Sequence, residues 1–109
     1  MELNELRKEI NDIDDRLISL FVQRMAVAAQ VADYKKNHNM PIYIPERETE
    51  ILQNISAKAG PELSAYAKVL YATLFTLSRN YQSKCNSSQS SLVENEDYER
   101  LLQFLHDLR

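Results

Sequence analysis

The feature that most constrains this chain is a segment of about 35 residues, over 3–37, that contains neither glycine nor proline. Its apolar residues recur in steps that alternate between four and three, which is the heptad pattern of a helix packed lengthwise against a partner. The positions of this seam are Leu6, Ile10, Ile13, Leu17, Leu20, Val27, Val31 and Tyr34. A helix of this length measures about 50 Å, whereas a globule of this size has a radius of gyration of about 13 Å. We therefore expect the helix to project from its own domain and to bury its seam on a second copy, in a homodimer.

Two further helices are predicted in the middle of the chain. After turn residues at 37–41, a proline opens a helix expected over 45–59, and Gly60-Pro61 ends it. A third helix is predicted over about 62–82. Its apolar stripe consists of Leu63, Ala67, Leu70, Leu74, Leu77 and Tyr81. Apart from a weak run at 41–44, no segment has the pattern of a strand, so the expected fold class is all-α, with three helices in the protomer.

The C-terminal part of the chain has a different composition. Residues 83–91 are polar and rich in serine, which predicts a linker. A short amphipathic tail helix is predicted over about 94–108. We therefore divide the chain into a domain of residues 1–84 and a tail of residues 85–109. We expect the tail helix to pack on its own dimer, since an exposed apolar stripe would be adhesive; covering a pocket entrance or docking a partner protein are the alternatives.

Composition excludes several classes of function. The chain has 109 residues and one glycine, Gly60, which excludes phosphate-binding loops, dinucleotide fingerprints and nucleophile elbows. One cysteine, Cys85, and two histidines, His38 and His106, cannot form a closed zinc site, so we expect no metal and no cofactor. The net charge of −3 argues against nucleic acid, and no apolar run approaches the roughly 20 residues that span a membrane. The lone thiol and the charged start of the chain predict a cytoplasmic protein.

Charged residues on the first helix are the first sign of a binding site. Arg24 occupies the one seam position that is not apolar, between Leu20 and Val27, and a buried guanidinium needs an anionic partner. Lys35 projects within about 20° of the Arg24 direction and roughly 16 Å further along the axis. Two cations so placed suit an elongated ligand with anionic ends, while a register-setting role for Arg24 is the alternative. Arg7 lies about 25 Å from Arg24, so it can approach that region only from the other chain of an antiparallel pair.

Polar residues also mark the other two helices. Ser78 and Gln82 lie four residues apart and share a face beside the apolar stripe of the third helix. They either point into a pocket or border the stripe and meet solvent. Arg47 and Glu48 stand in the first turn of the second helix, where charges at a helix end have an ordinary explanation.

Taken in order, these residues resemble the all-helical chorismate mutases over about residues 3–84. The text that carries the resemblance is Leu6-Arg7-Lys8-Glu9-Ile10, Ile13-Asp14, Leu17, Arg24, Lys35, Pro45-Glu46-Arg47-Glu48 and Ser78-Arg79-Asn80-Tyr81-Gln82. The resemblance implies an intertwined homodimer with two equivalent sites. It also implies the Claisen rearrangement of chorismate to prephenate, on the route to phenylalanine and tyrosine. This unimolecular step needs no nucleophile, metal or cofactor, but it does need a clamp on a dicarboxylate and stabilisation of charge on the ether oxygen.

The resemblance assigns the cationic and amide residues to this clamp. It implies that Arg24 binds one carboxylate of chorismate, that Arg7 of the partner chain binds the other, and that Arg47 adds positive field. Lys35 and Gln82 are implied to donate hydrogen bonds to the ether oxygen, an interaction that strengthens in the transition state. Because an amide donates at any physiological pH, we expect a flat activity profile across neutral pH.

Three other positions complete the site that the resemblance implies. Glu48 holds the ring hydroxyl, and Ser78 supports the carboxylate side of the substrate. Ile44 stands where some members of the family have an aspartate, so any contact at that position comes from the backbone.

Two alternatives to a mutase stay open at this point. An isochorismate-pyruvate lyase looks like the same scaffold with a similar cationic clamp, and Glu48 argues for the mutase. A non-catalytic helical dimerisation module is the second alternative, with Arg24 only fixing the register of the two chains.

Overall fold

In the computed structural model, which describes residues 2–86 and residue 103, three helices follow one another along the chain. They are α1 (Leu3–Asn37), α2 (Pro45–Ala59) and α3 (Ser64–Asn86). The described residues contain no strand, so the prediction of an all-α protein is confirmed. None of the helices in this part of the chain has the length and apolar character needed to cross a membrane. The predicted tail helix over 94–108 lies outside the described residues, and the division of the chain after residue 84 stays a prediction.

The ends of the helices coincide with the residues that the sequence predicts there. α1 contains no glycine or proline and ends at Asn37, two residues before Asn39 adopts a φ of 56°. Pro45 is the first residue of α2. Proline suits this position because a backbone N–H there would have no hydrogen-bond partner within the helix, so its absence costs nothing. Gly60 ends the same helix with a φ of 86°, a left-handed conformation that glycine adopts without steric cost.

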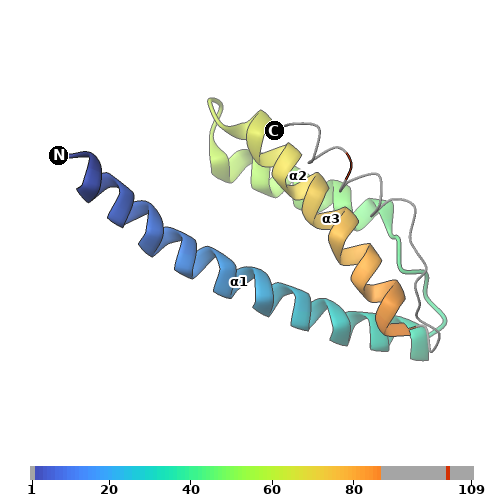
Figure 1. The fold of residues 1–109 in the computed structure, drawn as a ribbon. Coiled ribbons are helices and arrows are strands. Elements are labelled where there is room, and N and C mark those ends of the chain that lie inside the picture. The colour runs from blue at the N-terminus through green and yellow to red at the C-terminus, as the bar shows by residue number, and fades with distance from the viewer. Residues whose placement is uncertain (1, 87–102, 104–109) are drawn as a thin grey trace.

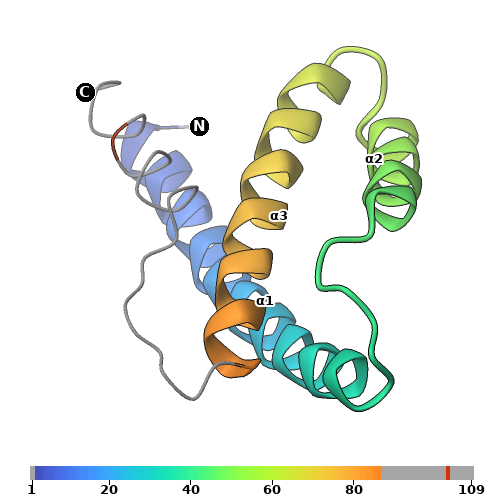
Figure 2. The same cartoon turned by 90° about the vertical axis from the view of Figure 1, so that its right-hand side faces the viewer.

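The third helix lies between the other two and packs against both of them (Figure 2). The N-terminal half of α1 projects away from α2 and α3 (Figure 1), and we call this half, residues 3–20, the arm. The principal extents are 53 × 29 × 25 Å and the radius of gyration is 16.4 Å, against about 13 Å for an ordinary globule of this length. The expectation that the first helix projects from its own domain is therefore confirmed.

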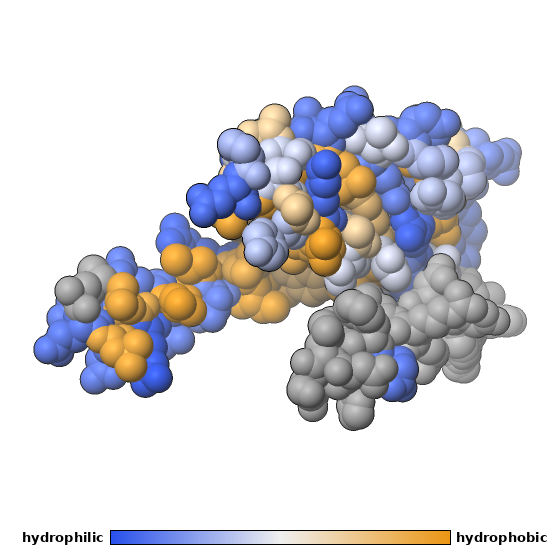
Figure 3. All heavy atoms as spheres, turned by 90° about the horizontal axis from the view of Figure 1, so that it is seen from above, coloured by the Kyte–Doolittle hydropathy of each residue, from blue (hydrophilic) through white to orange (hydrophobic). Residues whose placement is uncertain are grey.

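The apolar seam of the arm is open to solvent in the single chain. Ile10 is 58% exposed, Ile13 51% and Leu17 58%, and Figure 3 shows hydrophobic atoms gathered along the projecting arm. The buried residues of α1 are instead the small Ala28 and Ala32, in its C-terminal half. The folded protomer covers only this alanine face of its longest helix, since the seam residues Val27 and Tyr34 of the C-terminal half are also 55% and 56% exposed. The homodimer stays the prediction for what covers the seam.

The face that α3 turns inward differs from the predicted one. Leu70 and Tyr81 of the predicted stripe are 54% and 37% exposed, whereas Phe75, Ser78 and Gln82 are buried. The interpretation of Ser78 and Gln82 as residues that meet solvent is therefore wrong. Their side chains hydrogen-bond to each other, which lets two polar groups enter the interior without an unmade bond, and the more apolar stripe is left on the outside of the single chain.

The third helix also continues beyond its predicted end. Residues 83–86 are helical, so the linker predicted from 83 begins too early. The Nδ2 atom of Asn86 donates a hydrogen bond to the carbonyl of Ala32 at 3.0 Å, which ties the last turn of α3 to α1. This tertiary contact offsets the weak helix propensity of the serine and asparagine residues there. Cys85 consequently lies in the last turn of a helix, where its thiol is free and exposed.

Candidate active site

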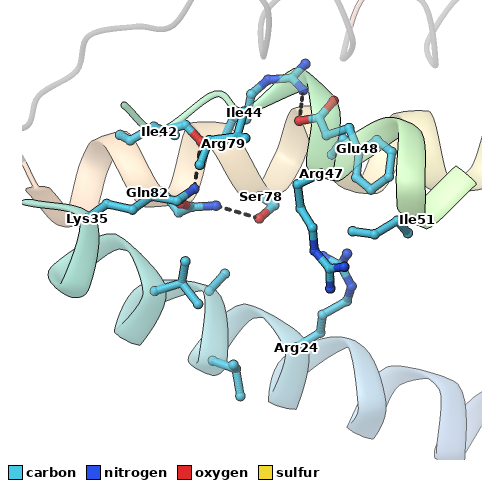
Figure 4. A pocket seen from close by; sticks show the side chains of 14 residues that line it. Arg24, Lys35, Ile42, Ile44, Arg47, Glu48, Ile51, Ser78, Arg79 and Gln82 are labelled. Carbon is cyan, nitrogen blue, oxygen red and sulfur yellow. Dashed lines mark hydrogen bonds and ion pairs between the residues drawn. The ribbon is translucent and has the colours of Figure 1, made fainter. Parts of the chain in front are cut away.

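A pocket of about 330 Å³ lies where the three helices and the loop before α2 meet (Figure 4). This volume is sufficient for a small organic ligand. The polar side chains of its lining are Arg24 and Lys35 from α1, Arg47 and Glu48 from α2, and Ser78, Arg79 and Gln82 from α3. Its apolar wall includes Val27, Val31, Ile42, Ile44, Ile51 and Phe75. Each helix of the protomer therefore contributes both walls and polar groups to one cavity.

Lys35 is the cation next to the loop before α2. Its Nζ donates hydrogen bonds to the carbonyl of Ile42 at 2.7 Å and to Oε1 of Gln82 at 3.2 Å. Desolvation by burial lowers the pKa of Lys35 from its ordinary value of 10.5, while the negative charge of Glu48 acts in the opposite direction. The ammonium group therefore loses its proton at a lower pH than a free lysine does.

Gln82 and Ser78 form a buried polar pair one turn apart on α3. The Nε2 atom of Gln82 donates to Oγ of Ser78 at 3.0 Å. Because an ammonium group can only donate, the contact with Lys35 requires the amide oxygen on that side and the NH2 group toward Ser78. Gln82 is 7% exposed and Ser78 8%, and no buried polar side-chain atom of the described residues lacks a partner. The network fixes the direction in which the amide presents its donors.

Two guanidinium groups converge in the part of the pocket that lies away from Lys35 (Figure 4). Arg24 from α1 and Arg47 from α2 extend toward one another in Figure 4. Arg24 also lies over the ring of Tyr71, with Cζ 5.8 Å from the ring centroid, and Arg47 pairs with Glu50 on its own helix. Like charges that face each other repel, and a carboxylate placed between them would be stabilised by both.

Glu48 is the one carboxylate in the described lining of the pocket. The Nη1 atom of Arg79 donates a hydrogen bond to its Oε2 atom. The guanidinium of Arg79 lies over the ring of Tyr43, 4.9 Å from the centroid. The Glu48 carboxylate is thus held by a cation that is itself seated on an aromatic ring.

The charge of the pocket is opposite to the charge of the chain. The chain carries −3 overall, whereas the described lining has a single carboxylate and the cationic side chains of Arg24, Lys35, Arg47 and Arg79. A concave surface of this sign concentrates small anions. Within the described part of the chain, no group of three or more histidine, cysteine, aspartate or glutamate residues is placed to hold a metal ion.

All of the predicted site residues except Arg7 line this pocket. Arg7 is exposed on the arm of α1, outside the pocket of its own chain. Ile44 contributes to the wall, and its carbonyl accepts the first backbone hydrogen bonds of α2, from Arg47 at 3.1 Å and Glu48 at 3.3 Å. The roles assigned to these residues stay predictions.

Arg79 is a lining residue to which sequence reasoning assigned no role. It stands three positions before Gln82, a spacing that puts two residues on neighbouring parts of one helix face. This spacing was the available signal, but a cation in a helix is more often solvated. Its partner Glu48 is 31 positions away in the chain, so only the packing of α2 against α3 reveals the pair.

The fold and the pocket define the class of protein: a helical protein whose cationic cavity suits a small molecule with more than one negative charge. The model of the family chorismate mutase type II matches residues 6–83 of the chain. The chain therefore belongs to this family, and the resemblance drawn from its residues is confirmed.

Several curated proteins are similar to part of the chain. A bifunctional chorismate mutase/prephenate dehydratase of Aquifex aeolicus is 44% identical over 54 residues, which are 50% of this chain and 15% of that protein. A T-protein of Haemophilus influenzae is 47% identical over 51 residues, 47% of this chain and 14% of that protein. A chorismate mutase of Methanocaldococcus jannaschii is 39% identical over 54 residues, 50% of this chain and 54% of that protein. The matched segments thus span less than two thirds of each relative, and no solved structure matches the chain.

Proposed function

We propose that the chain is a chorismate mutase, which converts chorismate to prephenate on the route to phenylalanine and tyrosine. The observation that carries the proposal is the arrangement of the pocket, in which Arg24 and Arg47 converge in one part and Lys35 meets Gln82 in another. Chorismate has two carboxylates and an ether oxygen, and these groups match a cavity with separated cationic and donor regions. Family membership supports the same activity.

The rearrangement breaks the carbon–oxygen bond of the ether and forms a carbon–carbon bond within the same molecule. No proton or electron enters or leaves, so the protein needs only to hold the reactive conformer and stabilise negative charge on the departing oxygen. Lys35 supplies an ammonium donor for this oxygen. Gln82 supplies an amide donor, because a primary amide has two N–H groups and Ser78 accepts from only one of them.

The proposal includes a homodimer in which Arg7 of one chain completes the pocket of the other. The exposed seam of the arm supports this arrangement, since its large apolar side chains, such as Ile13 and Leu17, are 51% and 58% exposed in the single chain. Arg7 lies on the same arm and outside its own pocket. A partner helix packed along the seam would bury the apolar residues and carry Arg7 toward Arg24 of the other chain.

We also propose a reducing, cytoplasmic location for the protein. The chain has a single cysteine, and the Cys85 thiol is free and exposed on α3. An exposed thiol without an intramolecular partner is typical of a compartment that keeps cysteines reduced.

The test of the activity is the consumption of chorismate by the purified chain, with identification of the product and with isochorismate in a parallel reaction. We expect prephenate from chorismate, with the rate lost in Arg24→Ala and kept in Lys58→Ala, a cation on the exposed end of α2 away from the pocket. Release of pyruvate from isochorismate at the higher rate would instead identify a lyase. Arg24→Leu tests the third possibility, a non-catalytic dimerisation module. In such a module the substitution should stabilise the dimer, whereas in an enzyme it should abolish catalysis.

A further inference from the structure

The ion pair of Arg79 and Glu48 connects three separate segments of the protomer. Arg79 belongs to α3, Glu48 to the first turn of α2, and Tyr43 to the loop before α2. Nη1 of Arg79 contacts Oε2 of Glu48, and the guanidinium lies 4.9 Å from the centroid of the Tyr43 ring. The side chains of Arg79 and Glu48 are 28% and 23% exposed, so the pair is partly withdrawn from the screening of bulk water.

The contact with Arg79 restricts the Glu48 side chain, which would otherwise move freely. A glutamate has several rotatable bonds, and ordering it costs conformational entropy. Arg79 engages Oε2 of Glu48, and no hydrogen bond to Oε1 of Glu48 is found among the described residues. The second oxygen is therefore available to accept from a ligand in the pocket. The planar guanidinium is in turn oriented by its contact with the Tyr43 ring, as stacked arginines commonly are.

We propose that Arg79 is a positioning residue that, seated on Tyr43, aims the Glu48 carboxylate at the ring hydroxyl of the substrate. The inference rests on the proposed function and on the role that the family resemblance implies for Glu48, which is to accept a hydrogen bond from that hydroxyl. Arg79 touches neither the substrate nor the reacting atoms in this role. It makes the pocket selective for a substrate that carries the hydroxyl, because without Arg79 the carboxylate is no longer held where the hydroxyl lies.

The experiment compares two substrates, chorismate and an analogue in which hydrogen replaces the ring hydroxyl. For Arg79→Met we expect kcat/KM for chorismate to fall about tenfold, the effect of roughly 1.4 kcal/mol, while kcat/KM for the analogue stays within about twofold of the parent chain. Arg79→Lys keeps the charge without the planar fork and is expected to recover part of the loss. Lys58→Met is the matched control, since it removes an exposed cation of α2 outside the pocket.

Further variants test the two contacts separately. In a Glu48→Gln chain, Arg79→Met is expected to cause no additional loss of discrimination between the substrates, because both changes act through the same carboxylate. Tyr43→Leu is expected to reproduce part of the loss and Tyr43→Phe to retain the selectivity, since the contact uses the ring and not the hydroxyl. Wild-type selectivity in Tyr43→Leu would overturn the role of the ring.

The outcomes for Arg79 separate this inference from the proposed function. If Arg79→Met loses equal activity toward both substrates, or toward neither, the positioning role is overturned while the mutase activity of the parent chain stands. If the parent chain itself fails to consume chorismate, the proposed function and this inference fall together. A selective loss with chorismate and a thermal midpoint near that of Lys58→Met supports the inference.

Discussion

Within α1, the C-terminal half has one face, that of Ala28 and Ala32, packed by its own chain, whereas no residue of the N-terminal half is buried. Ala28 and Ala32 are 8% and 0% exposed, while Ile10 and Leu17 are both 58% exposed. The small residues let α3 approach closely, and Asn86 bonds directly to the backbone of Ala32. The large residues of the arm instead require an apolar surface that the protomer does not supply. One helix therefore forms a wall of the pocket at one end and, in the proposed homodimer, would form the surface of association at the other.

The largest expected effect is at the C-terminal half of α1, which lines the proposed active site. Lys35→Ala removes the proposed donor for the ether oxygen, so kcat should fall by about 10² to 10³, the usual effect of losing one such donor. The thermal midpoint should change little, because relief of the unfavourable burial of the Lys35 ammonium offsets the loss of its hydrogen bonds to Ile42 and Gln82. Steady-state kinetics and a melting curve check both parts. A loss of folding without a selective loss of kcat would contradict the assignment.

The arm provides the next prediction. Arg7→Ala and Arg24→Ala should each lower kcat/KM by about 10², the effect of losing a charge-assisted contact to a carboxylate. When equal amounts of the two variants are unfolded, mixed and refolded, about half of the dimers should contain one chain of each kind. Such a dimer has one intact site and one doubly altered site, so about a quarter of the parental activity should return. Activity that does not return on mixing would place Arg7 and Arg24 outside a shared site.

A smaller effect is expected from pH, and it again concerns the C-terminal half of α1. Activity should be flat between about pH 6 and 8, since the amide of Gln82 does not titrate. At alkaline pH activity should fall as Lys35 loses its proton, earlier than for a lysine with the ordinary pKa of 10.5. Glu48→Gln should move this fall to still lower pH, because the Glu48 charge raises the pKa of Lys35. A pH–rate profile of both chains checks the direction, and a steep loss near neutral pH would contradict the role of Gln82.

The same proton sets the sign of a stability effect. The folded chain binds the Lys35 proton less tightly than the unfolded chain, whose lysine has the ordinary pKa of 10.5. This group therefore makes the folded state more stable as pH rises from the lowered pKa toward 10.5. Denaturant midpoints of the parent chain and of Lys35→Met, measured at two alkaline pH values, would show whether stability rises more steeply with pH in the parent chain.

The smallest expected effect is at the end of α3. Asn86→Ala removes the hydrogen bond to the Ala32 carbonyl and should lower the free energy of unfolding by about 1 kcal/mol, with kcat unchanged within about twofold. Ser83→Ala, in the same last turns but exposed, is the matched control. No loss in Asn86→Ala, or an equal gain in both variants, would show that helix propensity, which alanine raises, and not the contact with α1 determines the end of α3.

Much of the fold could be predicted from local signals. Pro45 and Gly60 mark the ends of α2 because their backbone preferences are independent of the rest of the chain. Arg24, as a break in an apolar seam, and Lys35, three turns further on, indicated one cationic face, and both line the pocket. The family resemblance added the residues of α2 and α3 that no local pattern could connect.

The sequence by itself determined the helices, the projecting seam and the residues that could bind an anion, because periodicity and residue type act over a few positions. Only the tertiary structure decided which face of α3 turns inward, since Ser78 and Gln82 are buried by pairing with each other and with Lys35. It also decided that Arg79 meets Glu48, because the two lie 31 positions apart and the packing of α2 on α3 brings them together. Local preferences set the elements, and contacts between distant residues set the chemistry of the pocket.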